Sequence, residues 1–284
     1  MSRKLRKYFI CSIVTAVTVC LVVFVLLGVS MARQTRQSIT EISDVYMSEM
    51  NQQLQQKFNS ITSLRLYQVD GLVKRIPPST AVYGEDMLSE LDTSAEVRSF
   101  TYLGLYSESG EEERIRGEKL NISNYDNLLF QLNEGDMMGL GVARDEAGEK
   151  YLMLAVTAQY PLKDGSKSKA IIAGVPMEYL NGALYLDEEK ANMYSHVIDG
   201  QGNFVIRNGD AFRENYFQRV METVESAYGK EPEELVRELK AAIAEGESYS
   251  MDVIVDGKVR RLFCSPVSDR VDWYLVSIMT NSGL

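Results

Sequence analysis

The pattern of apolar positions begins with an uncharged apolar block that runs from Phe9 to Val29. About 20 apolar residues in a helix are enough to cross a bilayer core of about 30 Å. Basic residues flank the block unequally, with Arg3, Lys4, Arg6 and Lys7 before it and Arg33 and Arg36 after it. The pattern predicts a transmembrane helix over residues 9–32, with residues 1–8 in the cytoplasm.

A cleaved signal peptide is the alternative interpretation of this block. Ser30-Met31-Ala32 has the small-x-small pattern of a cleavage site. The apolar core of a signal peptide, however, runs only about 7–15 residues, so an uncleaved anchor in the cell membrane is favoured. Both interpretations place almost everything after Arg36 outside the cytoplasm.

Beyond the apolar block, apolar residues recur at spacings of three and four from about Gln37 to Ile76, which predicts one long helix. These residues are Ile39, Ile42, Tyr46, Met50, Leu54, Phe58, Ile61 and Leu64. Pro77-Pro78 ends the pattern, and we assign residues 33–78 to a helical spine. The simple interpretation is a buried core helix. The sharper one is a lever rising from the membrane, with a homodimer seam near its base.

Strand-like and helical segments then follow in the same order twice, with little sequence identity between the copies. The first copy begins with a loop that leads into a short helix over 79–93. It has expected strands at 100–106, 114–118, 139–144, 150–162 and 170–175, and further helices at 124–133 and 177–186. The second has strands at 194–198, 204–207, 249–255, 259–266 and 273–279, and helices at 211–228 and 233–244. Five antiparallel strands need cover on at least one face, which the helical inserts and the spine can provide. The prediction is an α+β chain with two tandem antiparallel-sheet units, 79–187 and 188–284.

The net charge of the exported part limits the kinds of partner that it can bind. The chain of 284 residues has a net charge of −10, and four of its 30 basic residues precede the apolar block, so 26 basic and 40 acidic residues remain beyond it, or −14. Such an acidic surface argues against nucleic acid as a partner, because phosphate binding depends on clusters of Lys and Arg. It argues equally against flat docking on anionic lipid.

The chemistry-bearing residues give little support to catalysis. His196 is the only histidine, and the sequence has no Gly-x-Ser-x-Gly, HExxH, P-loop or GxGxxG motif. Cys11 and Cys20 lie in the apolar block, and Cys264 is expected to be a small buried apolar residue. We therefore expect no enzyme activity, no disulfide, no metal and no cofactor. Clustering of His196 with acidic residues in a pocket would favour the contrary hypothesis, an anchored enzyme.

The segment Asp199-Gly200-Gln201-Gly202-Asn203 faintly resembles a calcium-binding loop. Such a loop carries a Glu at its twelfth position, where this sequence has Asp210. Asp-Gly and Gly-Asn steps between two strand-like segments are typical of a tight turn. We therefore interpret the segment as a hairpin turn.

Small-molecule binding has better material, because the sequence contains 16 tyrosines, each with an apolar face and a polar tip. The candidate ligand-binding residues are Tyr102, Tyr106, Tyr151 and Tyr160 on the strands of the first copy, with Arg144 where a hairpin turns. If the helical insert closes over this sheet, Arg144 can pair with an anionic ligand, bidentately if it is a carboxylate. The alternative is that the tyrosines are core residues and that Arg144 faces solvent.

Three short segments add a resemblance to this pattern: Ala173-Gly174-Val175-Pro176-Met177-Glu178, then Ser195 to Gly202, then Trp273-Tyr274-Leu275-Val276. With the membrane helix and the long helix, the chain resembles the double Cache, tandem PAS-like sensor regions of bacterial chemoreceptors, sensor histidine kinases and diguanylate cyclases. The resemblance covers most of residues 36–284. It implies an extracytoplasmic sensor that binds a small molecule or an extracytoplasmic protein and signals to a cytoplasmic effector.

The sequence also departs from that family. Its amino-acid-binding members carry an Arg-x-Trp-Tyr motif in the distal unit, whereas the single Trp here is Trp273 in the other unit, and Arg144-Asp145 has no accompanying Tyr. Amino-acid recognition is therefore not carried over. In the family a second membrane helix and an effector follow the last strand, so we expect this sequence to be a fragment. The alternative function is an anchored surface protein that binds a partner without signalling.

Overall fold

The computed structural model describes residues 3–123, 128, 131–132, 137–184, 193–207, 214–225 and 230–280. It divides into two compact units, Met1–Glu49 and Met50–Leu284. The first unit consists of the N-terminal part of helix α1, which spans Arg3–Arg75. Within α1, the stretch Val17–Thr35 is long and apolar enough to cross a membrane, by length and composition.

The helix predicted for residues 37–76 is confirmed as part of α1, which ends directly before Ile76 and the two prolines. Its last turn closes with a hydrogen bond of 3.1 Å from the Ile76 N–H to the Leu72 carbonyl. Neither Pro77 nor Pro78 can continue this pattern, since proline has no backbone N–H.

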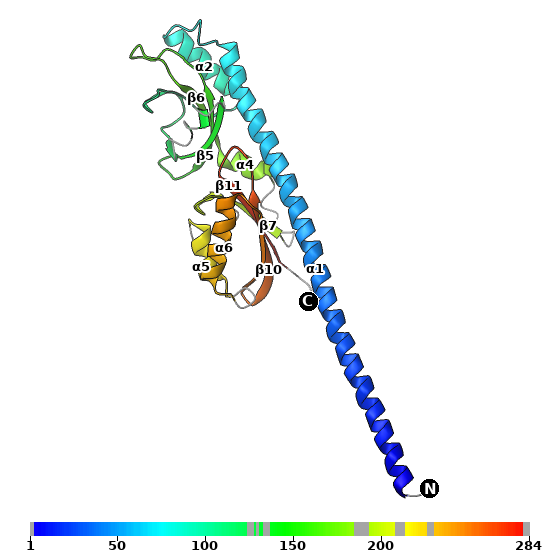
Figure 1. Cartoon of the computed structure of the whole chain (residues 1–284). Helices are drawn as coiled ribbons and strands as arrows, with labels where there is room; N and C mark the ends of the chain where they lie inside the picture. The colour runs from blue at the N-terminus through cyan, green and yellow to red at the C-terminus, as the bar shows by residue number, and fades with distance from the viewer. Residues whose placement is uncertain are drawn as a thin grey trace. The chain divides into compact units, whose positions relative to one another are not determined.

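The first sheet of the unit Met50–Leu284 has six antiparallel strands in the order β2-β1-β6-β5-β4-β3 (Figure 1). The elements are α2 (Glu85–Val97), β1 (Tyr102–Tyr106), β2 (Glu112–Arg116), β3 (Asn121–Ser123), β4 (Met138–Arg144), β5 (Lys150–Thr157), β6 (Ala170–Pro176) and α4 (Met177–Leu184). The hairpin expected between β4 and β5 is confirmed, and Gly148 supplies the left-handed residue of its turn, with φ +87°.

The second sheet has five antiparallel strands in the order β8-β7-β11-β10-β9. Its elements are β7 (Met193–Asp199), β8 (Phe204–Ile206), α5 (Tyr216–Thr223), α6 (Pro232–Glu245), β9 (Tyr249–Val255), β10 (Lys258–Pro266) and β11 (Trp273–Thr280). Helices α5 and α6 cover one face of this sheet, as Figure 1 shows. The two expected sheets are therefore separate, and the α+β fold class is confirmed.

Alternation along the strands sends side chains to two faces of each sheet. One face of each sheet contributes to a shared core, and the other face of each has a core of its own. Residues 50–75 of α1 contribute Phe58, Leu66, Val69 and Leu72 to a core that includes side chains of both sheets. Phe58 meets Trp273 of the second sheet edge to face, with ring centroids 5.9 Å apart. This part of α1 thus packs against both sheets, which is the cover that the sequence pattern predicts.

Several boundaries differ from the expected ones. Strand β3 was not expected, because Asn121–Ser123 is a three-residue edge strand with no apolar alternation. Helix α5 begins only at Tyr216, because the Asn215 side chain caps it by accepting from the N–H groups of residues 217 and 218. The remainder of the helices expected at 124–133 and 211–228 falls partly outside the described residues, although Leu128 and residues 131–132 are helical.

Candidate functional site

The register of the first sheet divides the five candidate residues between its two faces. Tyr151 pairs with Ala143, and the next pair along the same hairpin is Arg144 with Lys150. Since adjacent residues of a strand point to opposite faces, Arg144 lies on the face opposite Tyr151. The structure therefore brings Tyr102, Tyr106 and Tyr151 to one face, and it does not place Arg144 among them.

The face that carries these tyrosines contains a buried polar cluster, which we name the tyrosine–glutamate cluster: Tyr102, Tyr106 and Glu112. The two hydroxyls are hydrogen-bonded to each other, and the Tyr102 hydroxyl donates to Glu112 Oε1 over 2.9 Å. Burial, followed by the neighbouring Tyr106 and Glu112, raises the pKa of Tyr102 far above its ordinary value, so it is a neutral donor. Gly104 lies between the tyrosines, and a Cβ there would be 2.7 Å from the Tyr102 hydroxyl oxygen.

Small and apolar side chains surround this cluster. Met153, Ala155 and Ile172 continue the same face, and Leu120, Leu128 and Leu132 pack over it. The Tyr151 hydroxyl donates to Asp145 Oδ2 over 3.3 Å at the end of the β4–β5 hairpin. A carboxylate and tyrosine hydroxyls beside an apolar wall are suited to a small polar molecule, and a carboxylate favours an ammonium group.

Tyr160, the fifth candidate, does not lie in the tyrosine–glutamate cluster. Its side chain is fully buried in the core on the α1 side, and its hydroxyl donates to the Ile76 carbonyl over 2.6 Å. Burial raises the pKa of Tyr160 well above its ordinary value. This hydrogen bond satisfies a carbonyl at the C-terminal end of α1, which is a structural task.

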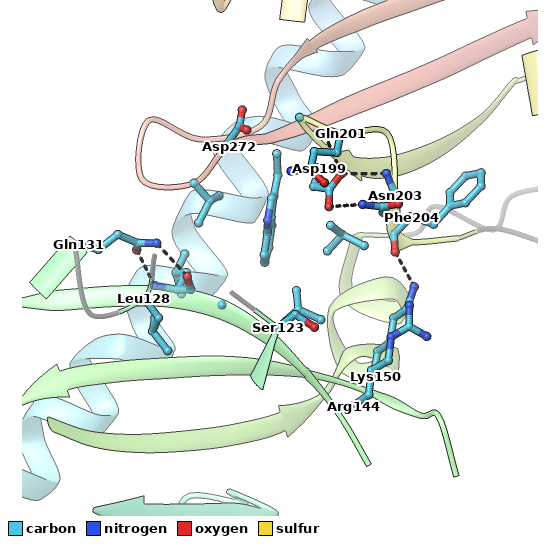
Figure 2. Close-up of a pocket in the computed structure, with 17 residues that line it drawn as sticks. Ser123, Leu128, Gln131, Arg144, Lys150, Asp199, Gln201, Asn203, Phe204 and Asp272 are labelled. Atoms are coloured by element: carbon cyan, nitrogen blue, oxygen red, sulfur yellow. Dashed lines mark hydrogen bonds between the residues drawn. The ribbon is translucent and has the colours of Figure 1, made fainter. Parts of the chain in front are cut away.

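A second candidate site is the cleft between the two sheets, with a volume of ≈ 340 Å³ (Figure 2). The first sheet contributes Gly141, Arg144 and Lys150, and the second contributes the β7–β8 turn with Asp199 and Asn203 and the β10–β11 loop with Asp272. Figure 2 shows Arg144 and Lys150 pointing toward Phe204 and the turn of the second sheet. Residues of both sheets line this cleft, which we call the junction.

Charged groups of the β4–β5 hairpin tie the sheets together at this junction. The Lys150 ammonium donates to the Phe204 carbonyl. Arg144 lies 3.5 Å from one carboxylate oxygen of Glu214, and Arg207 lies 3.5 Å from the other. Burial, and then the charge of Arg144, lower the pKa of Lys150 to about 8. The charged form of Lys150 is therefore less favourable at this position than in water.

The features needed for catalysis or metal binding do not come together in the described part of the chain. His196 is buried among Tyr194, Phe204 and Tyr216, and burial, then Arg219, lower its pKa to about 3. Burial likewise raises the pKa of the Cys264 thiol to about 12. No group of three or more His, Cys, Asp or Glu residues that could hold a metal ion occurs among the described residues.

The segment from Asp199 to Asn203 forms the β7–β8 hairpin turn, as the sequence predicts. The Asp199 side chain accepts from the backbone N–H groups of Gln201 and Asn203, so this carboxylate stabilises the turn itself. The Gly202 N–H closes the turn on the Asp199 carbonyl over 2.8 Å.

Sequence reasoning did not find two of the residues that matter here. Glu112 lies in a run of acidic residues that looks solvated, and only its pairing across β1 brings it to the tyrosines. Lys150 was assigned only to the start of the strand expected at 150–162. The alternation of β5 was the available signal, because it places Lys150 on the same face as the apolar Leu152.

No protein-family model matches this chain, and no curated protein does. Solved structures do resemble it. The ligand-binding domain of the Pseudomonas fluorescens chemoreceptor CtaA with L-isoleucine has a TM-score of 0.60 at 16% identity, covering 87% of this chain and 96% of that chain.

Two further solved structures are also similar to this chain over most of its length. The ligand-binding domain of the Pseudomonas aeruginosa amino acid chemoreceptor PctB with L-Gln has a TM-score of 0.57 at 14% identity, covering 83% of this chain and 90% of that chain. The ligand-binding domain of the Pseudomonas aeruginosa chemoreceptor PctC with GABA has a TM-score of 0.57 at 15% identity, covering 82% of this chain and 98% of that chain.

These matches extend over most of the chain, and they agree with the order of elements described above. The fold is that of the double Cache ligand-binding domains of bacterial chemoreceptors. The resemblance expected from the short sequence segments is thereby confirmed at the level of fold.

Proposed function

We propose that this chain is the membrane-anchored, extracytoplasmic sensor module of a bacterial receptor, and that it binds a small molecule without chemically changing it. The observation that carries the proposal is the similarity of 82–87% of the chain to chemoreceptor ligand-binding domains. In this proposal residues 79–187 form the membrane-distal unit, residues 188–284 the membrane-proximal unit, and residues 9–32 the anchor in the lipid bilayer.

The distal unit is the proposed ligand-binding unit, and the tyrosine–glutamate cluster is its recognition surface. Tyr102, Tyr106 and Glu112 offer hydroxyls and a carboxylate on a face that apolar side chains cover. This chemistry favours a ligand with a protonated amine, because an ammonium supplies both charge and hydrogen-bond donors to a carboxylate. The similar chemoreceptor domains were solved in complex with L-Gln, L-isoleucine and GABA, and such molecules are the first ligand class to test.

Transmission in this proposal uses the β4–β5 hairpin and α1. The hairpin carries Tyr151 on the ligand-facing side and the junction residues Arg144 and Lys150 on the other. A ligand can shift a two-state equilibrium only by the difference of its affinities for the two states. By analogy the effector is a histidine kinase, a diguanylate cyclase or a chemoreceptor signalling domain in the cytoplasm.

Thermal-shift measurement on the full chain in detergent micelles tests this proposal with a panel of L-amino acids and GABA. A ligand at about 100 times its Kd stabilises the folded state by about 2.7 kcal/mol, which is a shift of several degrees. Tyr102→Phe and Glu112→Gln should weaken binding at least about tenfold. Tyr249→Phe and Glu238→Gln are the matched controls, since Tyr249 donates to Glu238 over 2.6 Å in the second sheet's unit. Unchanged affinity in the first pair of variants would contradict the assigned surface.

A further inference from the structure

A separate cavity of ≈ 160 Å³ lies in the unit of the second sheet, between the sheet and α5. Its polar lining comprises two guanidiniums, Arg219 from α5 and Arg260 from β10, together with one carboxylate, Asp256, and the side chains of Tyr194, Tyr216 and Thr223. Its apolar lining consists of Val220, Val224, Val253, Val255, Leu262 and Ile278. The cavity therefore has a hydrocarbon part and a polar part in which two positive charges outnumber one negative charge.

Arg260 has unused hydrogen-bonding capacity at this cavity. Its Nη1 donates to the Tyr194 hydroxyl over 3.2 Å, and its Nε is buried with no hydrogen-bond partner among the described residues. The Asp256 carboxylate is 3.7 Å from Nη2, and the Asp256 side chain is 84% exposed. An anion in the cavity would give the terminal N–H groups of Arg260 a further acceptor, and a charge-assisted hydrogen bond is stronger than a neutral one.

The neighbouring arginine on the same strand is satisfied in a different way. Arg261 points to the other face of the sheet, where it pairs with the buried Asp252 over 2.9 Å. Within one strand, therefore, one arginine has a built-in buried carboxylate and the next has only an exposed one. This difference indicates that the cavity side leaves room for a carboxylate from outside the chain.

Arg219 adds a second positive charge beside the cavity. Its Nη1 lies 3.3 Å from His196 Nε2. Because His196 is buried and close to Arg219 and Arg207, its ring stays neutral and accepts this hydrogen bond. The ring holds the guanidinium in place without neutralising its charge, and a guanidinium has further N–H groups to offer a ligand.

The volume limits the size of the anion. An engineered apolar cavity of about 150 Å³ holds benzene, which has six heavy atoms. Carboxylic acids of two to four carbons have about four to six heavy atoms in their ionised form, which fits that volume. One charged end and a short alkyl end also match the two parts of the lining.

We propose that the unit of the second sheet contains its own binding site for a small monocarboxylate of two to four carbons. The carboxylate pairs with Arg260 and Arg219, and the alkyl group contacts the valines of α5 and β9. This site is independent of the one proposed on the first sheet, and either can fail without the other.

Titration calorimetry on the full chain in detergent micelles tests the site with propionate, and with propionamide as the neutral analogue of the same shape. We expect propionate to bind and propionamide not to bind. Arg260→Gln should lower the affinity at least about tenfold, because a charge-assisted pair is lost. Arg237→Gln is the matched control, because this exposed arginine of α6 pairs only across the helix surface with Glu234. Glu112→Gln should leave propionate binding unchanged.

Hydrogen exchange of the unaltered protein locates the site without relying on a variant. Added propionate should slow exchange in α5 and in the β9–β10 hairpin. Equal binding of propionate and propionamide, undiminished binding in the Arg260→Gln variant, or protection confined to β1–β6 would each overturn the proposal.

Discussion

The Ser277 hydroxyl donates a hydrogen bond of 2.6 Å to the Asn51 side-chain oxygen, joining β11 to α1 across 226 residues of sequence. The Asn51 amide in turn donates to the Ser265 hydroxyl over 3.0 Å. Asn51 is buried, so its polar atoms depend on these partners. The second sheet is thus attached to the helix by a specific polar contact as well as by apolar packing.

Replacing Asn51 with leucine should destabilise the protein by about 1–3 kcal/mol, because the buried Ser277 hydroxyl and the half-buried Ser265 hydroxyl each lose their hydrogen bond to Asn51. Urea unfolding followed by circular dichroism measures the change. Gln52→Leu is the control, since Gln52 is exposed on the same helix and should change stability by less than about 0.5 kcal/mol. Equal effects of the two substitutions would show that the polar contact contributes nothing specific.

Tyr160→Phe should cost about 1–2 kcal/mol, because it removes the donor to the buried Ile76 carbonyl while leaving the ring in place. The unfolding midpoint in urea reports the loss. Tyr67→Phe removes a hydroxyl from an exposed tyrosine of α1 and should be close to neutral. A neutral Tyr160→Phe variant would mean that water satisfies the carbonyl equally well.

His196 should make the stability of the protein fall as the solution becomes acidic. Its folded-state pKa is lowered to about 3 from 6.5, so the unfolded chain binds a proton between these values while the folded chain does not. In that window the stability decreases toward low pH by up to about 1.4 kcal/mol per unit.

The His196→Gln variant isolates this contribution, because the carboxylates titrate in both proteins and cancel in the comparison. Unfolding free energies measured between pH 4 and pH 7 should slope less steeply in the variant. Parallel slopes would show that His196 takes up its proton in the folded state as readily as in the unfolded state.

Gly202→Ala should be among the most damaging single-methyl additions in the chain. Gly202 has φ +85°, and a Cβ there would lie 2.4 Å from the Phe217 ring. Strain of about 1–2 kcal/mol from the left-handed backbone adds to overpacking of about 1–3 kcal/mol. Gly165→Ala is a matched control, with φ +86° and open space around the added methyl. The difference between the two variants measures the clash alone.

Residues 9–32 should remain in the mature protein as an anchor. Intact-mass measurement of the membrane fraction should give the uncleaved chain, and alkaline carbonate should fail to release it. A mature protein that starts after Ala32 would support the signal-peptide alternative instead. Converting Val22 and Leu26 to arginine provides a control, because charges at the centre of the span should prevent stable insertion.

The sequence was sufficient for the order of most elements, the edge strand β3 excepted, because its signals are local. The stripe from Phe58 to Leu64, the turn at Asp199 and the alternation in β5 each depend on neighbours only a few residues apart. The boundary of α5 was missed because it depends on a single capping side chain, Asn215, within a polar stretch that has no clear pattern.

The candidate site was predicted less completely, because its members come together only through register. Tyr102 and Tyr106 were selected for their chemistry, and the structure places them in contact. Arg144 was selected because it lies where a hairpin turns and could pair with an anionic ligand, yet a shift of one residue reverses the face that a strand residue occupies. Glu112 was overlooked because the strand that delivers it has no apolar periodicity.

In β5, Lys150 and Tyr151 are consecutive, and they project from opposite surfaces of the same strand. If a ligand contacts Tyr151, a single peptide bond separates that residue from Lys150, which is hydrogen-bonded to the second sheet. A small rotation of that peptide about the strand axis would displace the lysine from the Phe204 carbonyl at once. A signal could then pass from the first sheet to the second without any repacking of the hydrophobic cores.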